Sequence, residues 1–197
     1  TMEATTRIYD RTLLAVFKEN RKALRDMTLQ ADELYKHSSE RKYSLMSTLK
    51  RLQDRDIDTA QYYVQCVDYL NEMTKALLHI TRPAFDHIDN NHEGLSKEQT
   101  NDLMRINDEV ELIYRGIITM MRQRNFAEID QILTMRDNLF DTIADAIKSE
   151  LERINNTLSN TKASLLYLTL MNETKNMVLQ SRNLLKSQKY FLDHQKE

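Results

Sequence analysis

Apolar side chains recur every three or four residues along most of this 197-residue chain, which is the spacing of one helical face. The stretch from Ala60 to Asn90 shows it most clearly, with apolar positions at 60, 64, 67, 70, 73, 77, 80/81, 84 and 88. Asp58 and Gln61 resemble a capping box, so a helix is predicted to start there and to end by Asn90. Pro83 falls late in this helix and either kinks it or occupies a loosened turn.

The chain before this central helix has a heptad-like rhythm. No Pro or Gly interrupts residues 5–52, so the pattern predicts either one very long helix or two helices broken near Asp26. Residues 53–59 are polar and predict a turn between this segment and the central helix. The number of helices in the first part of the chain therefore stays open.

Three further helices are predicted after the central one. A capping box at Ser96–Gln99 opens a helix from Lys97 to about Arg124, and a second box at Asn125–Glu128 opens the next. That next helix has apolar positions 129, 133, 140, 143, 147, 151 and 154, and residues 155–160 are the expected break after it. The last helix has apolar positions 165, 168, 171, 178, 185 and 192, and its charged end at 194–197 should fray.

The composition supports helices and excludes several classes of protein. Only 2 Gly and 1 Pro leave little for hairpins, and a net charge of −2 argues against a nucleic-acid surface. A single cysteine, Cys66, excludes an internal disulfide and is interpreted as a packed side chain. No apolar run approaches the ~18 residues of a membrane span. The predicted fold class is all-α, an antiparallel bundle of five or six long helices.

A faint internal repeat suggests two related halves. Sliding the chain by 101 residues places Asn71-Glu72 on Asn172-Glu173 and superposes several apolar positions around them. We therefore predict a first helical half at residues 1–93 and a second at 94–197, packed together as one domain.

Three carboxylates are the candidate metal ligands. Asp68 and Glu72 stand four residues apart and share a helical face at about 6 Å, and the repeat adds Glu173. Carboxylates on facing helices can bind Mg, Ca, Mn or iron, so a divalent metal or iron is a candidate cofactor. The alternative is a solvated acid pair balanced by Lys75 and Arg82, and the Glu-x-x-His pairs of di-iron bundles do not occur.

Other motifs give no chemistry. Residues 89–94 imitate the first half of an EF-hand loop, but Thr100 stands where the bidentate Glu belongs, so a helix-ending turn is favoured. The five histidines lack zincin spacing and are interpreted as surface residues. There is no nucleophile motif and no phosphate-cradling Gly loop, so the chain is predicted not to be an enzyme.

Several stretches carry a family resemblance. The segments 62–73, 85–91 and 17–24, together with 172–175 and 187–191, make the chain resemble the PhoU-like cytoplasmic domain of bacterial sodium/phosphate cotransporters. The resemblance implies a two-half helical bundle that regulates phosphate uptake without catalysis. It also implies a transmembrane transporter region of the same polypeptide as partner, and a place at the cytoplasmic face of the inner membrane within an integral membrane protein. A homo-oligomer is a separate expectation.

The resemblance also bears on the metal ligands. PhoU proteins bind metal through a Glu/Asp-x-x-x-Asp motif in each half. Here Asp68-x-x-x-Glu72 has the acids in the opposite order, and Thr169-x-x-x-Glu173 has lost one acid. Two alternatives to the transport regulator therefore stay open: a free-standing helical scaffold or signalling adaptor, and a carboxylate metal-binding regulator.

Overall fold

The computed structural model describes residues 1–50, 57–156 and 160–194, and this part of the chain contains helices and no strand. The predicted all-α bundle is confirmed, with six helices across the described ranges. They are α1 (Met2–Phe17), α2 (Arg21–Leu49), α3 (Ile57–Asp89), α4 (Lys97–Gln123), α5 (Ile129–Asn155) and α6 (Thr161–His194).

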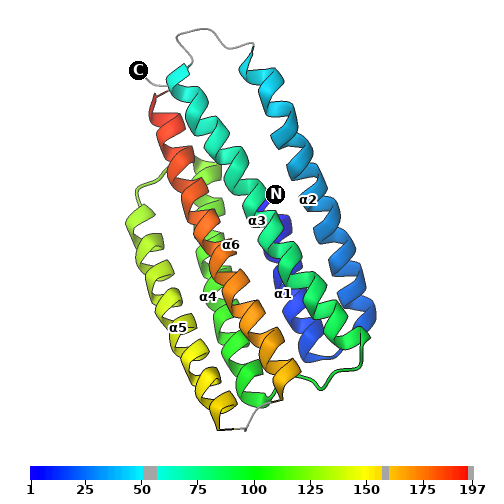
Figure 1. The fold of residues 1–197 in the computed structure, drawn as a ribbon. Coiled ribbons are helices and arrows are strands. Elements are labelled where there is room, and N and C mark those ends of the chain that lie inside the picture. Colours follow the sequence, from blue (N-terminus) through cyan, green and yellow to red (C-terminus); the bar gives the residue numbers. More distant parts are fainter. Residues whose placement is uncertain (51–56, 157–159, 195–197) are drawn as a thin grey trace.

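The helices run side by side along one long axis (Figure 1). α3 and α6 pack against each other through the middle of the bundle, with α2 against the outer side of α3 and α5 against α6. α1 and α4 lie behind them in Figure 1 and contact each other. The first three helices therefore meet the last three mainly through the pairs α3–α6 and α1–α4, and a buried hydrogen bond between Tyr9 and Thr174 also links α1 to α6.

The first break differs from the prediction. Neither one long helix nor a break near Asp26 is correct, because α1 ends at Phe17 and α2 begins at Arg21. Glu19 adopts the left-handed conformation (φ 49°), with its N–H bonded to Val16 O, and the Asn20 N–H bonds to Ala15 O. This is a Schellman end, which needs no glycine. The Asn20 side chain then caps α2 by accepting from the Ala23 N–H at 3.0 Å.

Most later boundaries are confirmed. Ser96 and Gln99 form the predicted capping box, with the Gln99 N–H 3.2 Å from Ser96 Oγ. The box predicted at Asn125–Glu128 is wrong: Glu128 makes no side-chain cap, and Asn125 Oδ1 accepts from Ala127 instead. The predicted capping side chain at 58 and most of the predicted 53–59 turn lie outside the described residues; α3 starts within one residue of the prediction.

One core extends through the bundle. All six helices contribute large side chains with at most 1% exposure; among them are Tyr9, Leu24, Met73, Leu77, Leu103, Tyr114, Leu139, Ile143 and Tyr167. The apolar seams predicted for α5 and α6 are partly wrong, because Leu151 and Leu165 are 53% and 63% exposed. α6 contacts α3, α4 and α5, so its buried face is wider than predicted: it includes Leu166 and Leu170 as well as the predicted positions 171, 178 and 185.

The predicted boundary between halves falls in the connection from α3 to α4. Each side then holds three helices, α1–α3 and α4–α6. The dipeptides that suggested the repeat differ in burial, since Asn71 is buried and Asn172 is exposed. The relation between the halves stays a prediction.

Candidate functional site

The three predicted metal ligands lie on the facing helices α3 and α6 but do not converge. The Asp68 carboxylate bonds to Lys42 of α2, with Nζ 3.0 Å from Oδ1. This hydrogen bond raises the pKa of the Lys42 ammonium. Glu72 pairs with Lys75 on its own helix at 3.6 Å, so each acid of the Asp68-x-x-x-Glu72 motif already has a cation beside it.

Glu72 and Glu173 share a polar cavity between α3 and α6. Its volume is about 330 Å³, and its lining residues are Glu72, Lys75, Ala76, His79, Glu173, Asn176 and Gln180. His79 Nδ1 lies 3.7 Å from Glu173 Oε1, which is an ion pair when the imidazole is protonated. Two of the three predicted acids, Glu72 and Glu173, therefore line one cavity, and Asp68 lies outside it.

The donor set of this cavity offers carboxylate, imidazole and amide groups. Within the described residues, however, no group of three or more His, Cys, Asp or Glu side chains is arranged to bind a metal ion. Lys75 also enters the cavity and neutralises Glu72. Metal binding by Asp68, Glu72 and Glu173 stays a prediction.

The run at 89–94 is a helix-ending turn, as predicted. Asn91 adopts the left-handed conformation (φ 52°) just after α3, and the His92 N–H bonds to His87 O. Asp89, the residue at the first ligand position of the EF-hand-like pattern, forms an ion pair with Arg21 of α2. His87 is buried, which corrects its interpretation as a surface residue, and its ring donates a hydrogen bond to Glu93 O at 2.8 Å.

Cys66 is a packed thiol, as predicted. It is buried, and burial raises the pKa of its thiol to about 11. A nucleophilic cysteine needs a thiol whose pKa is lowered by a neighbouring cation, and the pKa of Cys66 is shifted in the opposite direction.

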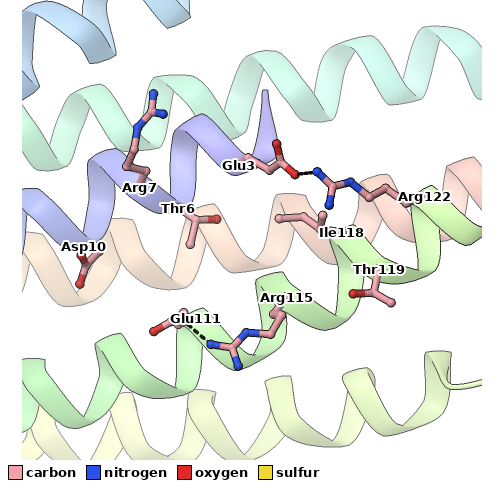
Figure 2. A pocket seen from close by; sticks show the side chains of 9 residues that line it. All are labelled: Glu3, Thr6, Arg7, Asp10, Glu111, Arg115, Ile118, Thr119 and Arg122. Carbon is pink, nitrogen blue, oxygen red and sulfur yellow. Dashed lines mark hydrogen bonds and ion pairs between the residues drawn. The ribbon is translucent and has the colours of Figure 1, made fainter.

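A second candidate site lies between α1 and α4, where sequence reasoning placed nothing. It is a groove of about 440 Å³ lined by Glu3, Thr6, Arg7, Asp10, Glu111, Arg115, Ile118, Thr119 and Arg122 (Figure 2). Every polar side chain in it comes from one of two helices that are far apart in sequence. We call it the α1–α4 groove.

Two polar contacts cross between α1 and α4 along the groove. At one end Arg122 of α4 forms an ion pair with Glu3 of α1, and both side chains are largely exposed. At the other end Asn107 Nδ2 donates to Asp10 Oδ1 at 2.8 Å. Arg7 and Arg115 lie between these two contacts, one on each helix.

The two middle arginines have different surroundings. Arg115 Nη2 lies 2.5 Å from Glu111 Oε1, an exposed ion pair within α4. Arg7 has no hydrogen-bond or ion-pair partner in the part of the chain that the structure describes. Its guanidinium is turned away from Arg115 in Figure 2.

The groove continues into an adjoining apolar section. A cavity of about 310 Å³ shares Glu3, Ile118 and Arg122 with it and adds Thr1, Met2, Leu70 and Met121. One end of the combined groove is therefore lined by charged groups and the other by aliphatic and thioether groups.

The sequence does contain a pattern that corresponds to this groove, namely one polar helical face on each of its two helices. Glu111, Arg115, Thr119 and Arg122 follow the three-four spacing of one polar helical face, and Glu3, Thr6, Arg7 and Asp10 follow the same spacing. The polar face of α1 could not be recognised in the sequence, because the pattern did not predict where α1 ends and α2 begins. Which polar faces meet is a tertiary fact that periodicity does not give.

A fully buried carboxylate was also missed. Glu150 of α5 has 0% exposure and accepts from Gln99 Nε2 at 2.8 Å, Ser164 Oγ at 2.5 Å and Arg153 Nε at 2.8 Å. These partners come from α4, α6 and α5, so the carboxylate joins three helices at one end of the bundle. Its environment is saturated with donors, which makes it a structural group.

Together these features define a six-helix bundle whose described part has polar surface cavities and no identifiable catalytic group. No family model and no curated protein matches the sequence. Solved structures do match. The phosphate transport system regulatory protein PhoU from Streptococcus pneumoniae aligns with a TM-score of 0.77 at 11% identity, covering 97% of this chain and 89% of that one. PhoU from Pseudomonas aeruginosa aligns with a TM-score of 0.69 at 12% identity, covering 98% and 91%.

These likenesses establish a PhoU-like fold, which confirms that part of the resemblance. The predicted place at the cytoplasmic face of the inner membrane, within an integral membrane protein, is wrong. The two solved neighbours are PhoU chains matched over 89% and 91% of their own length, so this fold makes up nearly all of each. Among the described residues, no helix is both long and apolar enough to cross a bilayer. The predicted contact with a transporter is not tested by these comparisons.

Proposed function

We propose that this chain is a non-enzymatic regulator of phosphate transport. The observation that carries the proposal is the match of the six-helix fold to two PhoU structures over nearly the whole chain, one of them described as a regulatory protein of a phosphate transport system.

The mechanism we propose is a shift in helix packing. A bundle of long helices can adopt alternative packings, and an effector changes their populations only if it binds one packing more tightly. The predicted halves, 1–93 and 94–197, would move relative to each other at the α3–α6 and α1–α4 contacts. We further propose that the regulated partner is a sodium-dependent phosphate transporter, as the sequence resemblance implied, and that the chain acts as a homo-oligomer.

Phosphate uptake in cells tests the proposal. The gene is deleted in its own host, and uptake of radiolabelled phosphate is measured in phosphate-rich and phosphate-poor medium, each with and without sodium. We expect deletion to alter the response of uptake to external phosphate and the wild-type gene to restore it. Unchanged uptake in all four media would contradict the regulatory role, whereas an altered uptake that is independent of sodium would contradict only the sodium-dependent partner.

A metal-binding regulator is a second candidate, favoured by the cavity that Glu72 and Glu173 share. Elemental analysis of protein purified without chelator measures the metal content directly. If the carboxylates are ligands, bound Mn, Fe or Mg should fall in Glu72→Ala and Glu173→Ala but not in a control such as Glu152→Ala, which lies on the exposed face of α5. A metal content near zero in the wild-type protein would remove this candidate.

A further inference from the structure

We propose that the α1–α4 groove is a binding site for a phosphoryl group, carried either by inorganic phosphate or by a small phosphomonoester. For its regulatory consequence this inference rests on the proposed function; the site itself is argued from the groove. The volume of about 440 Å³ lies within the range of about 300–1,000 Å³ typical of small-molecule sites.

The first argument is the supply of donors in the groove. A guanidinium has five N–H donors in a fork that matches phosphate oxygens, and three such groups line this groove. Arg115 and Arg122 each use part of that capacity on one carboxylate, and Arg7 uses none within the described residues. The Thr119 hydroxyl likewise has no hydrogen-bond partner there. Free donors therefore come from both helices.

The second argument is the position of the charges. Of the three carboxylates, Glu3 pairs with Arg122 at one end of the groove, Asp10 accepts from Asn107 at the other, and Glu111 pairs with Arg115 along α4. Arg7 and Arg115 occupy the middle, on opposite helices. If Arg7 turned inward, a dianion bound between the two helices would make an attractive contact with a guanidinium of each.

The third argument is that the competing carboxylates hold their arginines weakly. The side chains of Arg115 and Glu111 are 66% and 53% exposed, and those of Arg122 and Glu3 are 70% and 60% exposed. Ion pairs this exposed are worth about 0–1 kcal/mol. Charge-assisted bidentate contacts from arginine to phosphate are stronger, so the ligand can share or displace these carboxylates.

The adjoining apolar section bears on the source of the phosphoryl group. Leu70, Met121 and Ile118 continue the groove beyond Arg122, so a phosphomonoester with a flat or aliphatic portion would fill both sections. Inorganic phosphate would occupy the charged section alone.

The consequence for regulation follows from the Glu3–Arg122 pair. This pair crosses from α1 to α4, one of the two main helix contacts between the first three and the last three helices. A ligand that takes Arg122 away from Glu3 would loosen that crossing. Binding in the groove and the packing of the bundle are thereby coupled.

Isothermal titration calorimetry on the full chain in a chloride buffer tests the site. The probes are inorganic phosphate, adenosine 5′-monophosphate and adenosine without a phosphate. We expect the phosphate-bearing probes to bind and adenosine not to bind. Tighter binding of the nucleotide by tenfold or more assigns the site to phosphomonoesters, and equal binding assigns it to the phosphoryl group alone.

Variants locate the binding. Arg7→Gln and Arg115→Gln should each weaken it roughly tenfold or more, because a charge-assisted contact is lost. Thr119→Val should weaken it less. Arg105→Gln is the matched control, since Arg105 is exposed on α4 and lines neither section of the groove. Circular dichroism checks that each variant is folded.

Two results would overturn the site: no binding of either phosphate-bearing probe, or binding that Arg7→Gln and Arg115→Gln leave unchanged. The uptake experiment tests the regulatory role independently of the binding site. Altered uptake on gene deletion without any binding overturns the site alone, and binding without any effect of deletion overturns the regulatory role alone.

Discussion

The buried carboxylate of Glu150 gives the sharpest test of how the bundle is held together. In Glu150→Ala, the donors of Gln99 and Ser164 lose their acceptor, and both residues are only 2% exposed. A buried donor left without a partner costs about 1–3 kcal/mol. The Arg153 side chain is 25% exposed, so it can turn to water and limits the loss. We expect the free energy of unfolding to fall by about 3 kcal/mol, within the range of about 3–5 for breaking a buried pair.

Urea denaturation followed by circular dichroism measures this change, and a thermal melt should show a decrease in Tm of roughly 6–12 °C. Glu152→Ala is the matched control, because Glu152 is two residues away on the exposed face of α5 and should change stability by under about 0.5 kcal/mol. Adding Arg153→Met to Glu150→Ala should cost less than the two single changes summed, since both charges are then removed. A loss below about 1 kcal/mol in Glu150→Ala would refute the view that this carboxylate joins three helices.

Three other predictions follow from burial and charge. Leu103→Ala removes a fully buried side chain and should destabilise the protein by about 2–5 kcal/mol in urea, whereas Leu165→Ala, 63% exposed, should cost under about 0.5 kcal/mol. Asp68→Ala breaks a half-exposed pair with Lys42 and should change stability by no more than about 0.5 kcal/mol, and a larger loss would mean that the pair is structurally important. Burial raises the pKa of Cys66 from 9.0 to about 11, so iodoacetamide should alkylate the folded protein slowly at neutral pH and faster as the pH approaches 11. Labelling as fast as in urea-unfolded protein at neutral pH would contradict that burial.

The fold class could be predicted because helical periodicity and end signals act locally. The Ser96–Gln99 capping box was found three residues apart in sequence and is present in the structure. The break at Glu19 was missed because neither glycine nor proline marks it. A left-handed non-glycine residue costs about 1–2 kcal/mol, which the Schellman bonds and the Asn20 cap offset.

The sites were less predictable because they depend on which helix faces meet. Spacing correctly placed Glu72 and Glu173 on facing helices, but it did not show that Lys42 of α2 would pair with Asp68. Glu150 reads in the sequence as one more acid on a charged helix, and only its donors on α4 and α6 distinguish it. Hydrogen-bond partners that lie 14 and 51 residues away in sequence cannot be identified from apolar positions spaced by three and four residues.

The two main helix contacts between the first three helices and the last three differ in extent, because α3 and α6 touch along far more of their length than α1 and α4 do. Along α3 and α6 the bundle is held by buried groups such as Met73, whose sulfur accepts from Ser181 Oγ at 3.1 Å. Between α1 and α4, buried core side chains of both helices are accompanied by polar contacts at the surface, such as the exposed Glu3–Arg122 pair. Exposed pairs exchange with water and ions at little cost, whereas a packed core resists displacement. A change in packing between the two sets of helices is therefore least costly when α3 and α6 act as the hinge and the α1–α4 groove opens or closes.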